Sequence, residues 1–203
     1  MTDSALGRTG AVALMASGCA SMLFWIMAAS AGTFAGAAVV QQATWIPAQT
    51  LHVIAALLAV FGFMSVYSAE RHRAGVSGLI AFVLATTGNV LFFVDGVIAL
   101  VIFPSLARSI PAALETSGAM NQGMTLVLFV TIAAINMIGQ VAFGVITWRA
   151  GVFPRPAAAL LAIGGTLFNL PPGPVPMIVL AVGGVLWGVA ASWLGWSLAR
   201  ESK

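Results

Sequence analysis

The chain has 203 residues, of which 61% are hydrophobic and 6% are charged, with a formal net charge of +3. Soluble domains carry about 25% charged residues, so this composition excludes a water-exposed globular surface and predicts an integral membrane protein. The pI near 10.0 does not indicate nucleic-acid binding, because the basic residues fall in predicted loops and termini and form no patch. With about 20 apolar residues needed per spanning helix, the length suits a single transmembrane domain covering residues 1–203.

Six apolar runs predict an all-α, polytopic transmembrane helix bundle. The helices are expected at about 11–31, 48–68, 76–102, 124–147, 156–169 and 177–198. Pro104 is expected to end the third helix, and the segment 32–47 to form an interfacial loop or a re-entrant piece with Trp45 at headgroup level. Small residues in the first helix, and the Gly184–Ser192 stripe in the last, predict close helix packing.

One helical hairpin is predicted to occur twice. The sequence Arg73–Val76 recurs 76 residues later as Arg149–Val152, at the ends of the second and fourth predicted helices. At the same spacing, three further residues recur: Gly88, Leu91 and Phe92 as Gly164, Leu167 and Phe168. We therefore expect helices 2–3 and 4–5 to be a duplicated hairpin in parallel orientation.

The basic residues predict the orientation of the chain in the membrane. With six helices, one face of the membrane carries Arg108 alone. The other face carries seven basic residues: Arg8, Arg71, Arg73, Arg149, Arg155, Arg200 and Lys203. Basic loops stay in the cytoplasm, so both termini are predicted to be cytoplasmic.

No cofactor or metal site is predicted. Cys19 is the only cysteine and falls in the first apolar run, so it allows neither an intrachain disulfide nor a cysteine-based metal site, and we interpret it as a packing residue. The chain contains no phosphate-binding loop, dinucleotide-binding fingerprint, zinc-protease motif or nucleophile elbow.

His52 and Asp95 are the first pair of candidate functional residues. They are nearly equidistant from the Arg71–Arg73 turn, so in an antiparallel hairpin both lie roughly 30 Å from it. A histidine and a carboxylate at one level can hold a proton, bind a cation or orient a polar substrate group. The alternative is a hydrated or purely structural pair at the outer boundary of the membrane.

Amide side chains form a second, deeper candidate layer. Asn89, Asn136 and Asn169 are predicted near the midplane, with Gln140 one helical turn from Asn136. Hydrogen bonds between helices are a sufficient explanation for these residues. The alternative is that they line a ligand cavity or a polar path. Trp187, also within a span, is interpreted as a packing residue.

Two stretches carry a resemblance to other proteins. They are Trp148–Arg155, followed by Leu160–Gly165, and Gly188–Arg200 with Trp193-Leu194-Gly195-Trp196 inside it. Together they resemble a broad group of uncharacterised small bacterial multi-helix inner-membrane proteins. The resemblance covers the C-terminal third and implies a bacterial inner-membrane location, without implying an activity.

Three classes of function follow from the sequence. The sparse titratable groups and the small-residue stripes favour a non-enzymatic protein that binds a lipid-like, hydrophobic ligand, or a subunit of a homo-oligomer or larger membrane complex. The alternative is a small proton- or cation-coupled transporter or channel that uses Asp95 and His52. The third hypothesis is an intramembrane enzyme, for which the same two residues are the only candidate acid and base.

Overall fold

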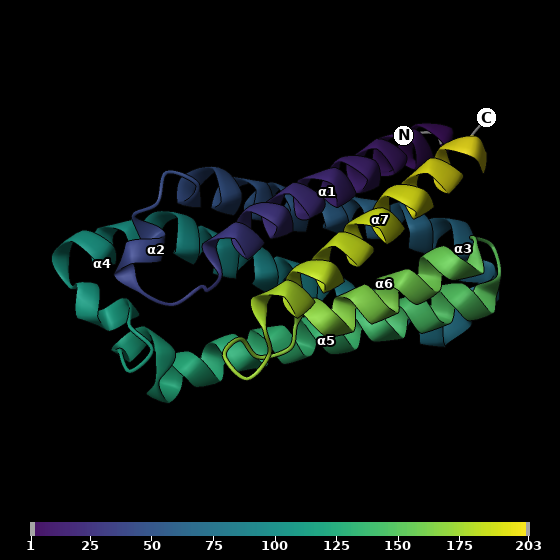
Figure 1. The fold of residues 1–203 in the computed structure, drawn as a ribbon. Helices are drawn as coiled ribbons and strands as arrows, with labels where there is room; N and C mark the ends of the chain where they lie inside the picture. The colour runs from purple at the N-terminus through teal and green to yellow at the C-terminus, as the bar shows by residue number, and fades with distance from the viewer. Residues whose placement is uncertain (1–2, 202–203) are drawn as a thin grey trace.

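The computed structural model describes residues 3–201, and the side chains of residues 7–200, as an all-helical bundle (Figure 1). The α-helices are α1 (Asp3–Ala31), α2 (Ala37–Val40), α3 (Trp45–Val97), α4 (Phe103–Ser109), α5 (Gly123–Ala150), α6 (Arg155–Phe168) and α7 (Met177–Glu201). A π-helical turn, Ile98–Ile102, joins α3 to α4, and two 3-10 turns, Pro111–Leu114 and Ala119–Asn121, precede α5. The all-α prediction is therefore confirmed for the described residues.

Within the described part of the chain, four helices are long and apolar enough to cross a membrane. They cover Gly7–Ala31, Trp45–Ser109, Gly123–Ala150 and Met177–Arg200, and α6 is a shorter apolar helix. These lengths and compositions are compatible with a membrane protein.

The longest helix, α3, folds back on itself at Gly75. This residue has φ 60° and ψ −152°, a conformation that is open to glycine and strained for other residues. The rings of Tyr67 and Phe82 stack across the turn with centroids 4.8 Å apart. Further from the turn, a Cβ placed on Gly96 would lie 3.3 Å from Cγ of His52. The two arms of α3, 45–74 and 76–97, thus run antiparallel.

A second turn, between α5 and α6, also contains a left-handed glycine. Gly151 ends α5 with φ 63° and ψ 24°, and its N–H donates to the carbonyl of Thr147. Beyond the turn, α5 and α6 pack closely, since a Cβ on Gly144 would lie 2.7 Å from the carbonyl oxygen of Ala158. The two helices are antiparallel neighbours (Figure 1).

Small residues also bring the remaining helices together. A Cβ on Gly139 of α5 would lie 2.7 Å from the Cα of Ala85, in the second arm of α3. Between α1 and α7, a Cβ on Gly188 would lie 2.6 Å from the carbonyl oxygen of Gly18. The absence of side chains at the crossing allows α1 and α7 to approach closely, which is a use of the small residues that the sequence analysis singled out in each helix.

The structure differs from the prediction at the end of the bundle that contains α2 and α4. The α-helix does not stop because of Pro104. The regular α-helix ends at Val97, and Pro104 lies in the first turn of α4, directly after the π turn. Proline has no N–H to donate back into the π turn, where the carbonyl oxygen of Ala99 instead accepts a hydrogen bond from the indole of Trp45. The segment 32–47 contains the one-turn helix α2, which packs over α4.

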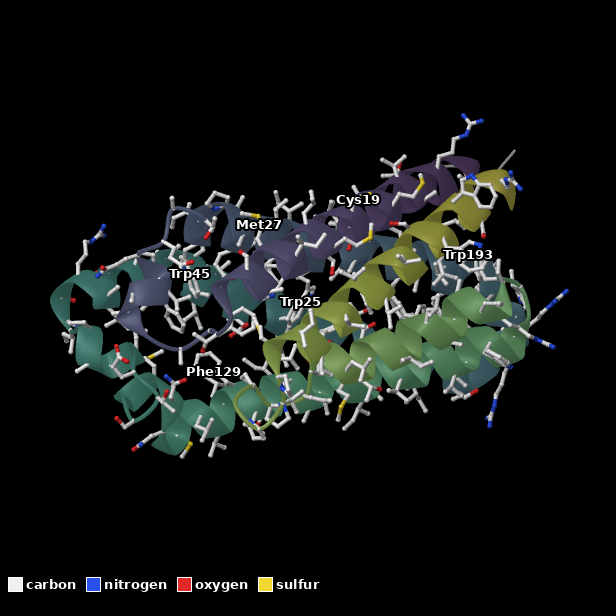
Figure 2. The ribbon with its side chains drawn as sticks, in the orientation of Figure 1. Cys19, Trp25, Met27, Trp45, Phe129 and Trp193 are labelled. Carbon is white, nitrogen blue, oxygen red and sulfur yellow. The ribbon has the colours of Figure 1, made fainter. Side chains whose placement is uncertain are left out.

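Trp45 and Cys19 also differ from expectation. Trp45 is 6% exposed, and its indole N–H donates to the carbonyl oxygen of Ala99 inside the π turn over 3.0 Å. Trp45 is therefore packed inside the protein, beneath α2 (Figure 2). Cys19 is exposed, because the α1 face that carries Ser17, Gly18 and Ser21 is the one that packs inward.

The two turns and both ends of the described chain lie at one end of the bundle, and α2 and α4 lie at the other (Figure 1). Long side chains with blue nitrogen atoms project from the end with the turns (Figure 2). The hydroxyl of Thr147 in α5 donates to Oε1 of Glu70 in α3 over 3.0 Å, which fixes the two turns at the same level.

Candidate functional site

A cluster of amide side chains joins α5, α6 and α7 inside the bundle. Asn136 is fully buried, and its Oδ1 accepts a hydrogen bond of 3.0 Å from Nδ2 of Asn169. The same Nδ2 donates to the carbonyl oxygen of Gly165 over 2.7 Å. Asn169 therefore ends α6 by bonding both to its own helix and to α5.

Gln140 extends this cluster to α7. It is fully buried one turn from Asn136, and its Oε1 accepts a hydrogen bond of 2.9 Å from the indole Nε1 of Trp187. Gly165 packs directly on the Gln140 side chain. Trp187 is thus more than a packing residue, because its single N–H donor determines the orientation of the glutamine amide.

The structure brings together Asn136, Gln140 and Asn169, but it gives Asn89 a different role. Asn89 is 3% exposed and donates to the carbonyl oxygen of Ala85, one turn earlier in its own helix, over 2.8 Å. The adjacent Gly88 packs on the main chain of Asn136, so Asn89 lies at the level of the cluster.

Three polar atoms of the cluster have no hydrogen-bond partner among the described residues. They are Nδ2 of Asn136, Nε2 of Gln140 and Oδ1 of Asn169. A buried polar group without a partner costs about 1–3 kcal/mol relative to a paired one. The cluster therefore offers two donors and one acceptor beyond those that hold the helices together.

His52 lies in an aromatic environment near the other end of the bundle. Its ring is 4.7 Å from that of Phe24 and 4.6 Å from that of Phe92, measured between centroids. Nε2 of the imidazole has no hydrogen-bond partner among the described residues.

Asp95 lies at the level of His52, because the neighbouring Gly96 packs on the imidazole ring. The Asp95 side chain is half-buried. No ion pair joins it to His52 in the part of the chain that the structure describes. The two residues share a level of the hairpin, as predicted, without direct pairing.

Glu70 is a buried carboxyl group that the sequence analysis missed. It is 1% exposed, accepts the hydrogen bond from Thr147 through Oε1, and has no described partner at Oε2. In the sequence it directly precedes the charged residues of the predicted turn, Arg71–Arg73. The signal that could have found it is helical spacing, because Ala59, Phe63, Val66 and Glu70 follow at intervals of three or four residues along one buried face.

The bundle has a groove on its outer side, between α5 and α6. Its volume is about 340 Å³. The lining residues come from the last two turns of α5 and the first turns of α6: Gly144, Val145, Trp148, Arg149, Ala158, Ala159, Ala162 and Ile163. The walls are apolar apart from Arg149, which lies at the end of the groove nearest the turn.

A smaller cavity of about 20 Å³ lies beneath α2. Phe24, Phe34, Trp45 and Gln49 are among its lining residues. This volume is close to that of one water molecule, too small for an organic ligand. Gln49 is 3% exposed, and its Oε1 has no partner among the described residues.

Comparison of the chain with known protein families, with curated proteins and with solved structures gives no match.

Proposed function

We propose that this chain is a non-enzymatic, six-span protein of the bacterial inner membrane that binds a lipid-like hydrophobic molecule in the groove between α5 and α6. The groove is the observation that carries the proposal. Its volume of about 340 Å³ falls within the range of about 300–1,000 Å³ that is typical of ligand sites. Its apolar walls match an alkyl chain.

The groove exists because small residues line its floor. Ala158, Ala159 and Ala162 form one side, and Gly144 forms the other. Larger residues border this floor, and Trp148 and Ile163 are 42% and 51% exposed. In a membrane, the apolar part of this recess faces the lipid acyl chains, which favours a hydrocarbon guest.

The six-span topology is supported by the two turns. Each contains a glycine with positive φ, Gly75 or Gly151, and these two residues occupy the same place in the repeated Arg-Ala-Gly-Val sequence. Both arms of α3 then cross the membrane, as do α1, α5 and α7. α6 has 14 residues and is roughly 21 Å long, so the segment 169–176 completes its crossing.

The cytoplasmic position of both termini is supported by charge. Arginines flank both turns, and the ends of the described chain lie beside them (Figure 1). The positive-inside rule places this end in the cytoplasm. The bacterial inner membrane is favoured by the resemblance of the C-terminal third.

The non-enzymatic role is supported by the use of the polar side chains. Asn136, Asn169 and Gln140 make hydrogen bonds that join helices, and His52 is enclosed by phenylalanine rings. A transporter that used His52 and Asp95 would need a connected polar path from them toward the turns. The amide cluster and Glu70 lie on that side, but among the described residues no hydrogen bond joins His52 or Asp95 to the cluster. The aromatic contacts around His52 favour packing over such a path.

The test is native mass spectrometry of the protein extracted gently from its own membrane. Wild type is expected to retain a hydrophobic molecule. Ala159→Leu, which fills the groove, is expected to lose it. Ala134→Leu is the matched control, because Ala134 lies on α5 outside the groove.

A bound molecule that both variants retain would place the ligand elsewhere and contradict the proposal. A wild-type protein that carries no hydrophobic molecule would contradict it as well. Partner chains found in the same spectra would instead support a role as subunit of a larger membrane complex.

A further inference from the structure

The groove has one charged lining residue, and its position is informative. Arg149 lies in the last turn of α5, at the end of the groove nearest the turn. The side chain is exposed, and beside it Trp148 is 42% exposed. The groove is thus apolar along most of its length and has the guanidinium of Arg149 and the indole of Trp148 at the end nearest the turn.

This arrangement is complementary to one class of molecule. An acyl chain fits the alanine- and glycine-lined part, and an anionic group fits the guanidinium, which binds phosphate oxygens through paired N–H donors. Tryptophan side chains favour the region between hydrocarbon and headgroups. In the proposed topology this end faces the cytoplasmic leaflet, where anionic lipids give a negative surface potential.

We infer that the groove is a site for an anionic glycerophospholipid, with an acyl chain between α5 and α6 and the headgroup phosphate on Arg149. The inference rests on the proposed hydrophobic-ligand function and specifies the ligand class. Headgroup preference is set by Arg149, because the cationic group of a zwitterionic headgroup such as choline offsets the attraction between the phosphate and the guanidinium. The apolar walls contribute affinity without regard to the headgroup.

The chain offers a matched control for Arg149. Arg73 occupies the same place in the repeated Arg-Ala-Gly-Val sequence, at the turn of the first hairpin, and does not line the groove. Arg149→Gln and Arg73→Gln each remove one positive charge at the same end of the bundle. General attraction to an anionic surface is therefore weakened equally by both substitutions, and only a specific site distinguishes them.

The experiment measures binding of phosphatidylglycerol and phosphatidylcholine with identical acyl chains to the purified, delipidated protein, by native mass spectrometry. Wild type is expected to bind phosphatidylglycerol more tightly. Arg149→Gln is expected to reduce this preference about five-fold, which corresponds to about 1 kcal/mol, because it removes the charged side chain that lines the groove. Arg73→Gln is expected to leave the preference within two-fold of wild type, since Arg73 does not line the groove.

Equal binding of the two lipids by wild type would overturn the headgroup inference. Equal loss in the two arginine variants would also overturn it, because the attraction would then be non-specific. Ala159→Leu separates this failure from that of the proposed function. If it abolishes binding of both lipids while headgroup preference is absent, the hydrophobic site stands and the anionic class is wrong. If it leaves both lipids bound, the groove is not the site.

Discussion

Substitution of Gly139 by alanine tests how the two hairpins pack. A Cβ at this position would lie 2.7 Å from the Cα and the N of Ala85 and from the carbonyl carbon of Leu84. All three are main-chain atoms of α3, so no side-chain rotation can relieve the contact. Since ordinary contact begins at 3.4 Å, the helices must separate by 0.7 Å, the difference between these two distances.

The expected destabilisation follows from this separation. Overpacking of a close-packed interface costs about 1–3 kcal/mol. The higher helix propensity of alanine returns about 0.5–1 kcal/mol of this. From the middle of these two ranges, Gly139→Ala is therefore expected to lower the free energy of unfolding by about 1 kcal/mol.

Equilibrium unfolding of the purified protein in mixed micelles measures this change, with Gly96→Ala as the control. A Cβ on Gly96 meets only side-chain atoms of Val53 and His52, at 3.1–3.4 Å, so a smaller effect is expected. A Gly139→Ala protein as stable as wild type would refute the packing of α3 on α5 described above. A larger loss at Gly96 than at Gly139 would refute the steric reasoning.

Three further predictions concern the glycines of the two turns, the buried Glu70 and the buried Trp45. Gly75→Asn is expected to destabilise the protein by about 1–3 kcal/mol, because φ 60° with ψ −152° is open almost only to glycine. Gly151→Asn in the left-handed α conformation is expected to cost less, and equal thermal unfolding midpoints for the two variants would contradict the difference. Thr147→Val leaves Glu70 without its hydrogen bond and is expected to cost about 1–3 kcal/mol, an effect that a double-mutant cycle should find largely absent in a Glu70→Ala background. Trp45→Phe removes the hydrogen bond to the π turn and is expected to cost about 0.5–1.5 kcal/mol by equilibrium unfolding, and a neutral variant would argue against that bond.

The all-α architecture can be predicted because long apolar helices are evident in the composition and the hydropathy of the sequence. The turns at Gly75 and Gly151 were located by charge and by a repeated sequence, both of which are local features. The antiparallel arms of α3 followed from those turns, and the common level of His52 and Asp95 followed from simple counting along the helices.

The remaining differences arise where tertiary contacts override local signals. Pro104 predicts the end of a helix, but the preceding π turn places it in the first turn of α4. The position of Trp45 in the sequence is typical of a residue at the membrane interface, but α2 folds over it and buries it. Glu70 directly precedes the charged residues of the turn, but its helical register places it against Thr147.

The amide cluster was located by the sequence as a layer, although its connections were not. Counting along helices places Asn136 and Asn169 at similar depth, and the structure joins them directly. The bond between Gln140 and Trp187 depends on how α7 docks on α5, which no local pattern encodes. The groove between α5 and α6 likewise depends on the contact between two helices.

Photocrosslinking in the native membrane tests the central claim most directly. A photoreactive amino acid is placed at Ile163, which lines the groove and is 51% exposed, or at Ile138, which is 54% exposed on α5 outside it. The account predicts a discrete lipid adduct at Ile163 that Ala159→Leu removes, and only weak, heterogeneous lipid labelling at Ile138. Equal labelling of the two positions, insensitive to Ala159→Leu, would show that the groove holds ordinary bulk lipid and would contradict the account.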